Sequence, residues 1–246
     1  MKSIQDIAIV LPAYNEERDL PALLARIEET LSGQPFRYQV IVVDDGSADR
    51  TAEIAREAAT RMPLRLIQHP QNRGLGMAMQ TGLRAASSSA DAVITMDSDN
   101  SHDPANIPAM IRVLESGRAQ VVIASRYQKG SIVRGVPFYR QILSLGCFLL
   151  MKTVVPFRHV RDYSAGFRAY DSTILQRMIL AYGCDKLVEE SGFVCMLEIL
   201  LKLLGIGPTA AEIPYTLRYD LKAGASKLRI FRTLPRSLAV VNRSPA

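Results

Sequence analysis

The sequence has 246 residues, of which 48% are hydrophobic, and its formal net charge is +6. A chain of this length and composition can bury a full core, so we expect an ordinary globular protein with one large domain, or one domain with a tail. The three cysteines contain no Cys-x-x-Cys pair and leave an odd thiol, which argues against a disulfide or zinc framework and favours a reducing, cytosolic setting. The first residues lead directly into an apolar strand, so no secretory signal is expected.

Strand-like and helix-like segments alternate through the first half of the chain. Short, mostly apolar runs of strand length are separated by segments whose apolar residues recur at helical spacing, as they do from Leu20 to Leu31. This alternation predicts an α/β fold: a mostly parallel sheet with right-handed crossovers and helices on both faces. The predicted strands are residues 7–11, 40–43, 64–67, 92–96 and 121–124.

The loop between the first predicted strand and the first predicted helix runs from Pro12 to Glu17 and contains no glycine. A dinucleotide-binding fold places a Gly-x-Gly-x-x-Gly turn at this point of the chain. The absence of that turn argues against a nicotinamide-dependent dehydrogenase.

Two of the predicted strands end in acidic residues. Asp44 and Asp45 follow the second strand, and Asp97 and Asp99 follow the fourth. Ligands of open α/β sheets bind outside the carboxyl ends of the strands, and carboxylate pairs there suit Mg²⁺ or Mn²⁺ together with substrate phosphates. The alternative is structural, because an acidic turn with a helix cap, such as Ser47, gives the same pattern.

The second half of the chain is less regular. A polar loop is predicted at 128–137, an apolar segment at 142–151, a polar loop at 162–170 and an edge strand at 212–218, with helices at 174–182 and 194–204 between them. The apolar segment of ten residues covers roughly 15 Å as a helix, half of a bilayer core of about 30 Å. It is therefore either a core helix or a helix that lies along a membrane surface.

The excess of positive charge lies at the C-terminal end. From Arg218 to Arg243 there are seven basic residues and one acidic residue, Asp220. An anionic partner is expected to meet this end of the chain. A nucleic acid is not expected, because Phe231 is the only aromatic residue between Lys222 and Arg243 and offers too little surface for base stacking.

Four motifs together resemble those of inverting family 2 glycosyltransferases of the GT-A fold, and most closely the polyprenyl-phosphate sugar synthases. They are Pro12-Ala13-Tyr14-Asn15-Glu16, Asp44-Asp45-Gly46-Ser47, Asp97-Ser98-Asp99 and Gly224-Ala225-Ser226-Lys227. The resemblance extends from Ile7 to about Leu228. It implies a Rossmann-like GT-A catalytic domain at 1–228, including a possible interfacial helix at 138–156, and a basic amphipathic tail at 229–246.

The resemblance also implies which residues form the site. The nucleotide of the donor would be held by the first two motifs, and the diphosphate and a divalent metal by the third. The residues implied for donor binding are Pro12, Tyr14, Glu16, Val43, Asp45, Asp97, Ser98 and Asp99. Those implied for the metal are Asp97, Asp99 and Ser101, and those implied for the lipid phosphate are Arg126, Arg140 and Ser144.

One position departs from the family pattern. Relatives usually carry an arginine three residues before the glycine of the Gly-x-Ser-Lys loop, whereas this chain has Leu221. Arg218 and Lys222 are the two nearby residues that could supply the missing positive charge.

The expected reaction transfers a hexose from a nucleotide diphosphate sugar to a polyprenyl phosphate, and mannose is the hexose expected. A departing diphosphate needs a cation, which Mg²⁺ or Mn²⁺ on Asp99 and the ammonium of Lys227 would supply as the catalytic groups. A phosphate acceptor is already an anion and needs no strong base. A hydroxyl acceptor on a glycan or small molecule, the first alternative, would need one, with Asp162, Glu189 and Glu190 as candidates.

A second alternative from another class is a non-catalytic module that binds nucleotides or nucleic acid. The lipid acceptor predicts instead a peripheral enzyme on the cytoplasmic face of the membrane. Residues 142–151 and the basic tail would hold it there, since Arg229, Arg232 and Arg236 alternate with apolar residues at helical spacing.

Overall fold

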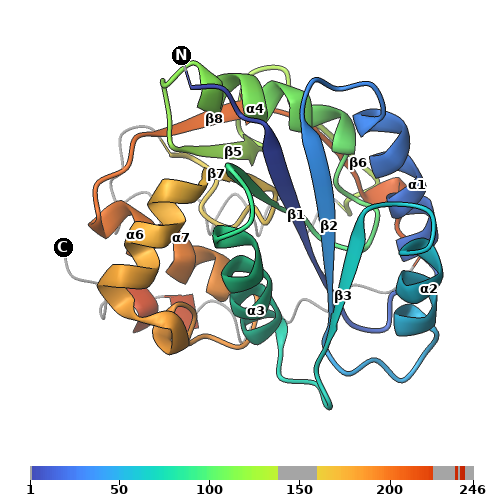
Figure 1. The fold of residues 1–246 in the computed structure, drawn as a ribbon. Helices are drawn as coiled ribbons and strands as arrows, with labels where there is room; N and C mark the ends of the chain where they lie inside the picture. Colours follow the sequence, from blue (N-terminus) through green and yellow to red (C-terminus); the bar gives the residue numbers. More distant parts are fainter. Residues whose placement is uncertain (1, 138–159, 224–235, 238, 242–246) are drawn as a thin grey trace.

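The computed structural model describes residues 2–137, 160–223, 236–237 and 239–241 of the chain (Figure 1). Within these residues seven strands form one sheet in the order β3-β2-β1-β4-β7-β5-β8, and all neighbours are parallel except β7, which is antiparallel to β4 and β5. The strands of this sheet are β1 (Asp6–Ala13), β2 (Arg37–Asp44), β3 (Leu64–Gln68), β4 (Ala92–Thr95), β5 (Val121–Ser125), β7 (Arg168–Asp171) and β8 (Ala210–Pro214).

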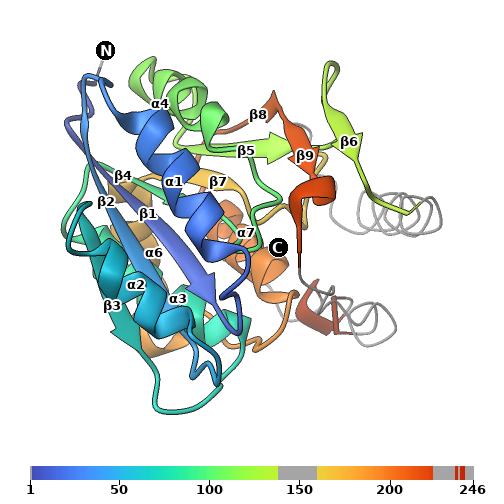
Figure 2. The same ribbon diagram turned by 90° about the vertical axis from the view of Figure 1, so that its right-hand side faces the viewer.

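Helices cover both faces of the sheet, as the alternation in the sequence predicts (Figures 1 and 2). Alternate residues of the same strand enter different cores: Val10 and Val43 face one core, whereas Ile9 and Val42 face the other. The first core is closed by α3 (Leu75–Ser87), α6 (Ser172–Tyr182) and α7 (Cys195–Gly205), and the second by α1 (Leu20–Leu31), α2 (Thr51–Ala58) and α4 (Ile107–Glu115). The described residues therefore form three layers, with a mostly parallel sheet between two layers of helices.

The register of the central strands brings three loops to one edge of the sheet. β1 lies between β2 and β4, with Pro12 opposite Val43 on one side and Val10 opposite Thr95 on the other. All three strands are parallel, so the loops that follow them lie side by side at the carboxyl end of the sheet. These loops contain the acidic and polar motifs singled out in the sequence.

The second half of the chain differs from the expectation at three places. Residues 168–170 of the predicted loop belong instead to strand β7, which lies inside the sheet between β4 and β5 and is buried at all four positions. The predicted edge strand 212–218 is divided into β8, which is at the edge of the main sheet, and β9 (Thr216–Arg218). Part of the predicted polar loop forms β6 (Ile132–Arg134), which pairs with β9 in a separate two-stranded sheet.

Two smaller features complete the comparison. Helical spacing of apolar residues after the second strand continues in the sequence to Ala59 and Met62, but α2 ends at Ala58; Ala59 is exposed, and Met62 is buried beyond the helix. Arg140, Ser144 and Lys227, the apolar segment 142–151 and most of the basic tail lie outside the described residues. In the part of the chain that the structure describes, no helix has the length and apolar character needed to cross a bilayer.

Candidate active site

The loop after β4 presents two carboxylates with different surroundings. The side chain of Asp97 keeps 36% of its surface exposed, whereas that of Asp99 keeps 13%. Asp99 Oδ1 accepts hydrogen bonds from the Ser101 amide at 3.1 Å and from Ser101 Oγ at 2.5 Å. Ser101 thus orients the Asp99 carboxylate, and its hydroxyl lies within reach of any cation that Asp99 holds.

A tight turn follows the two carboxylates. Asn100, between Asp99 and Ser101, adopts a left-handed backbone with φ 59°, which asparagine tolerates better than most residues. Arg26 on α1 fixes this turn, because its Nη1 donates to Asn100 Oδ1 at 2.7 Å and its Nη2 to Asp103 Oδ1 at 2.9 Å. The geometry of the loop is therefore set by helix α1 and not by the loop alone.

Asp97 is positioned by His102 and Gly166. Its amide donates to His102 Nδ1 at 3.0 Å, and the ring of His102 stacks on Phe167 with centroids 5.2 Å apart. A Cβ at Gly166 would lie 2.9 Å from Asp97 Oδ1, so the glycine leaves the space that the carboxylate occupies. Burial raises the pKa of Asp97, His102 opposes this rise, and the charge of Asp99 adds to it. The exposed part of the side chain nevertheless lets a ligand reach it.

Asp99 is bound by Lys222, which lies 123 residues further along the chain. Lys222 Nζ donates to Asp99 Oδ2, and the lysine side chain is only 8% exposed. Burial by itself would raise the pKa of Asp99, but the charge of Lys222 and the bonds from Lys222 and Ser101 hold it below its usual value. Arg218, the other candidate for the missing charge, pairs with Asp220 at 2.9 Å. Of these two residues, Lys222 is the one that contacts the carboxylate.

The loops after β1 and β2 are joined by hydrogen bonds between backbone amides and side-chain oxygens. The Asn15 amide donates to Ser47 Oγ at 2.9 Å, and the Ala48 amide donates to Asn15 Oδ1 at 2.9 Å. The Glu16 amide donates to Thr51 Oγ1 at 2.8 Å, at the start of α2. These bonds make one rigid wall from two loops whose residues were predicted to hold the nucleotide.

The predicted donor residues are not equally accessible. Tyr14 is 37% exposed, and Glu16 is half-buried. Val43 is fully buried in the core between the sheet and α3, so only its backbone can face a ligand. The carbonyl of Pro12 accepts a hydrogen bond from Ser98 Oγ at 2.7 Å, which ties the loop after β1 to the one after β4.

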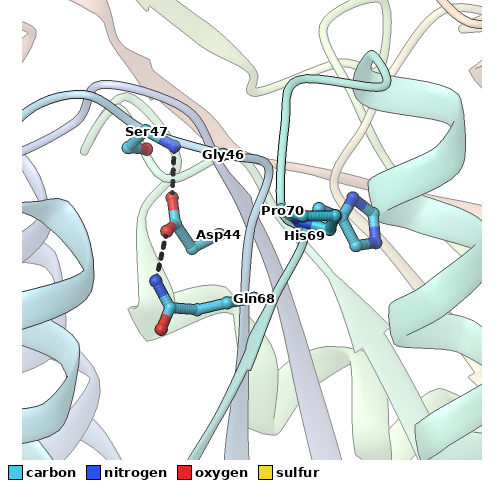
Figure 3. Close-up of a pocket in the computed structure, with 6 residues that line it drawn as sticks. All are labelled: Asp44, Gly46, Ser47, Gln68, His69 and Pro70. Carbon is cyan, nitrogen blue, oxygen red and sulfur yellow. Dashed lines mark hydrogen bonds between the residues drawn. The ribbon is translucent and has the colours of Figure 1, made fainter.

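A cavity of about 410 Å³ opens beside the loop after β2. Figure 3 shows Asp44 between Ser47 and Gln68: its carboxylate accepts from the Ser47 amide at 3.1 Å and from Gln68 Nε2 at 3.0 Å. His69 and Pro70 line another part of the same cavity. The cavity offers polar groups and a ring face to a flat, polar ligand such as a nucleobase.

Asp45, which was predicted to bind the donor, has a carboxylate that bonds to other parts of the protein. Its carboxylate bonds to His69 Nδ1 at 2.7 Å and accepts from the amides of Arg73 at 3.0 Å and Gly74 at 2.7 Å. Only 2% of the residue is exposed. Asp45 therefore shapes the loop from β3 to α3.

Arg126, predicted to face the acceptor phosphate, forms a bidentate ion pair. Its Nε and Nη2 donate to the Asp162 carboxylate at 2.8 Å and 2.6 Å, and Nη2 also reaches Ser164 Oγ at 2.7 Å. Nη1 takes no part in these bonds, and 24% of the Arg126 side chain is exposed. Burial would raise the pKa of Asp162, but the charge of Arg126 and its hydrogen bonds outweigh burial and lower it. Among the described residues, the Nη1 group of this guanidinium has no hydrogen-bond acceptor.

The three carboxylates considered as general bases are differently placed. Asp162 is fully buried and occupied by Arg126, which does not suit proton abstraction. The Glu189 side chain is 64% exposed and lies 3.2 Å from Lys202. Glu190 is half-buried, and its amide donates to Glu198 at 2.9 Å.

Sequence reasoning missed His102, Gly166 and Arg26, and a weak signal existed for only one of them. His102 lies within five residues of Asp97, close enough to be considered with the acidic motif. Gly166 and Arg26 contact the site from other elements, and nothing in the local sequence connects them with it. Lys222 was named only because a neighbouring position departs from the family pattern.

The oxygen set fits a divalent cation that is completed by its substrate. The described residues contain no group of three or more His, Cys, Asp or Glu side chains arranged to hold a metal. Mg²⁺ is commonly bound by one or two carboxylates together with waters and substrate phosphates. Asp97, Asp99 and the Ser101 hydroxyl provide such a partial set, which a donor diphosphate would complete.

Comparisons with known proteins agree with this arrangement. The family model described as "Glycosyl transferase family 2" matches residues 8–179. The dolichol-phosphate mannosyltransferase of Pyrococcus furiosus is 33% identical over 91% of this chain and 59% of its own length, so the chain spans about three fifths of that relative. The polyprenol monophosphomannose synthase of Mycolicibacterium smegmatis is 28% identical over 93% of this chain and 83% of its own length.

Solved structures share the fold at lower identity. The glucosyl-3-phosphoglycerate synthase of Mycobacterium tuberculosis, crystallised with Mn²⁺, UDP and glucosyl-3-phosphoglycerate, superposes with a TM-score of 0.71. Its sequence is 21% identical, and the match covers 98% of this chain and 81% of that one. The family model covers more than half of the residues and includes the strands that carry the acidic motifs. The chain belongs to glycosyl transferase family 2.

Proposed function

We propose that this chain transfers a hexose, in the first instance mannose, from a nucleotide diphosphate sugar to a polyprenyl phosphate, with inversion at the sugar carbon. The observation that carries the proposal is the arrangement of Asp97 and Asp99 beside the joined loops after β1 and β2. These groups can receive a diphosphate, its cation and its nucleoside at the carboxyl edge of one sheet. The names of the two mannosyltransferase relatives support the sugar and the lipid.

Each part of the site has a proposed role in binding or catalysis. Asp97 and Asp99 would hold Mg²⁺ or Mn²⁺, which when bound supplies positive charge to the departing diphosphate. Tyr14, Glu16 and the cavity beside Asp44 would hold the nucleoside. Arg126 would offer Nη1 to the acceptor phosphate, together with Arg140 and Ser144, while Lys227 would neutralise the leaving group as the second catalytic residue.

Phosphate and hydroxyl acceptors make different demands on these residues. A phosphate oxygen is already charged near pH 7 and needs a positive cradle rather than a base. The site provides a guanidinium held by a buried carboxylate, and its most enclosed acid, Asp162, is committed to that guanidinium. These observations favour the phosphate acceptor over the hydroxyl acceptor.

The lipid acceptor leads to the proposal of a peripheral enzyme on the cytoplasmic face of the membrane. A polyprenyl chain stays in the bilayer, so the site must approach the headgroups. The basic excess between Arg218 and Arg243 and the apolar segment 142–151 support contact with an anionic surface. The catalytic domain 1–228 and the tail 229–246 would then act together.

The deciding experiment incubates the protein with a panel of labelled sugar nucleotides, a polyprenyl phosphate and Mg²⁺ or Mn²⁺. Label should enter the organic phase with one donor, and a chelator should prevent it. Asp99→Asn should fold normally and lose most of this turnover, because it removes one hard ligand charge while keeping the size of the side chain. Label that passes instead to a water-soluble sugar, or transfer that the variant leaves intact, would contradict the proposal.

A further inference from the structure

The segment that follows β9 lies across the loop that carries the two acidic residues. The Arg218 amide donates to the carbonyl of Ser101 at 2.8 Å, and the Ala223 amide donates to Asp19 Oδ1 at 2.8 Å, just before α1. Between these two attachments stands Lys222, whose ammonium binds Asp99. Residues 218–223 are therefore fixed to the site at both ends and in between.

The place that Lys222 occupies is the one that a cation bound to Asp99 would need. Its ammonium contacts Asp99 Oδ2, lies 5.8 Å from the centre of the Tyr219 ring and is attracted by Glu16. Asp99 Oδ1 is already engaged by Ser101. With the lysine 8% exposed, there is little room for a second positive ion at the same oxygen.

We propose that Lys222 is a built-in competitor for the divalent cation at Asp99. In the donor-free protein the ammonium neutralises Asp99 and keeps two neighbouring carboxylates from repelling each other. When a divalent cation binds, Lys222 leaves Asp99 Oδ2, and its positive charge becomes available to the donor diphosphate that is proposed to bind at this site. The inference rests on the proposed metal site and adds to it a residue that sets the affinity of that site.

The proposal predicts a change in metal affinity that can be measured without turnover. Binding of Mn²⁺ alone is followed by the loss of the free-ion electron paramagnetic resonance signal. Lys222→Met keeps the length and apolar stem of the side chain but removes its charge, and a buried partner of a carboxylate is a strong competitor. We expect Lys222→Met to bind Mn²⁺ about tenfold more tightly than the parent, a shift equivalent to one decade in Kd.

Two control variants isolate the effect. Lys222→Arg keeps the positive charge and should bind Mn²⁺ within about twofold of the parent, since the guanidinium can also pair with Asp99. Lys2→Met makes the same chemical change at a Lys–Asp pair in another part of the sheet, where Lys2 lies 2.8 Å from Asp171. It should leave Mn²⁺ binding unchanged.

Displacement of the lysine itself is measured by acylating exposed amines and locating the labels by mass spectrometry. Lys222 should react slowly in the metal-free parent and several-fold faster with saturating Mn²⁺, whereas the rate at Lys2 should stay constant. If Lys222→Met and the parent bind Mn²⁺ equally, or Mn²⁺ leaves the labelling of Lys222 unchanged, the proposal is wrong while the metal site stands. If Mn²⁺ binds no more weakly to Asp99→Asn than to the parent, the metal site is wrong as well.

Discussion

At the scale of single residues, the position of Asp97 depends on the absence of a side chain at Gly166. In Gly166→Ala the new Cβ would lie 2.9 Å from Asp97 Oδ1 and 3.7 Å from His102 Cε1, so the carboxylate must move by several tenths of an ångström. A misplacement of this kind in a catalytic site lowers turnover by about tenfold to a hundredfold. We expect Gly166→Ala to show this loss in kcat, while its melting temperature stays close to that of the parent.

Gly192→Ala is the matched control for this substitution. A Cβ at Gly192 would meet no atom within 4 Å, so the same chemical change should leave both turnover and melting temperature nearly unaltered. If the two variants were equally active, the close contact at Gly166 would have no bearing on the reaction.

The buried pair of Arg126 and Asp162 gives a prediction about acid stability. The pKa of Asp162 is lower in the folded protein than its ordinary value of about 3.9, so its contribution to folding is complete above that pH and is lost as the pH falls through the folded value. Asp162→Asn breaks the pair and should lower the free energy of unfolding at pH 7 by about 3 kcal/mol. The difference between variant and parent should shrink below about pH 4, as followed by urea unfolding.

Asp185→Asn provides the comparison for an exposed pair. The Asp185 side chain is 92% exposed and lies 3.3 Å from Arg84, so its removal should change stability by no more than about 0.5 kcal/mol. A loss at Asp162 that was as small as this, or that did not depend on pH, would show that the buried pair contributes little to the stability of the fold.

Asp97 and Asp99 could be predicted from the sequence because a strand of uncharged residues directly precedes them, and parallel strands bring their carboxyl ends together. Gly166 contacts Asp97, and Phe167 stacks on His102, from a loop more than 60 residues further along the chain. No periodic pattern records such a contact. The sequence predicted Asp45 as a donor ligand by family resemblance, and the structure adds that its carboxylate holds the loop after β3.

At the scale of elements, α3 and the segment before α7 are in direct backbone contact. The Gly76 amide, in the first turn of α3, donates to the carbonyl of Ser191 at 3.1 Å, and Glu198 on α7 accepts from the amides of Glu189 and Glu190 at 3.0 Å and 2.9 Å. This network connects the helices that close one core with the loop that Asp45 fixes at Gly74.

A methyl group at position 76 should separate these elements. The Cβ of Gly76→Ala would lie 1.8 Å from the carbonyl oxygen of Glu190, which belongs to the backbone and cannot turn away. We expect a loss of about 1–3 kcal/mol in the free energy of unfolding, measured with urea, although alanine favours a helix over glycine. Gly192→Ala again serves as the control. Equal stability of the two variants would mean that the segment moves aside at little cost.

The elements that the sequence predicted correctly are those with a clear hydrophobic pattern. β1, β2 and β4 are apolar runs of strand length, and α1 has apolar residues on one face. β7 was missed because it contains Arg168 and Asp171, which are typical of loops. Both are buried: Arg168 donates to the carbonyls of Met196 and Tyr163, and Asp171 caps α6 and pairs with Lys2. These two residues interrupt the apolar run by which a buried strand is recognised in a sequence.

At the scale of the whole molecule, the sheet has two unlike edges. β3 forms one edge, and β8 forms the other, with the small sheet of β6 and β9 nearby (Figure 2). The segment after β9 brings the charged residues Arg218 and Lys222 toward the acidic loop, and the basic part of the chain begins there. A membrane-bound acceptor is therefore expected near the segment that follows β9.

The final prediction concerns that membrane contact and uses the basic residues of the tail. Each basic residue near an anionic bilayer contributes about 1 kcal/mol, so replacing Arg229, Arg232 and Arg236 by glutamine should weaken sedimentation with anionic vesicles roughly a hundredfold. Binding of the parent should also weaken as salt rises, since the attraction extends over a Debye length of about 8 Å at physiological ionic strength.

A control that replaces three arginines elsewhere in the chain distinguishes the effect of the tail from the effect of net charge. Arg56, Arg61 and Arg65 are exposed and lie on or next to α2 and the edge strand β3, so their replacement by glutamine lowers the net charge equally at the opposite edge of the sheet from β8. If the tail supplies the membrane contact, this control should sediment almost as well as the parent, because charges beyond a Debye length from the surface are screened. Equal losses in the two triple variants would attribute binding to net charge alone. A parent that failed to sediment even at low salt would exclude the membrane assignment.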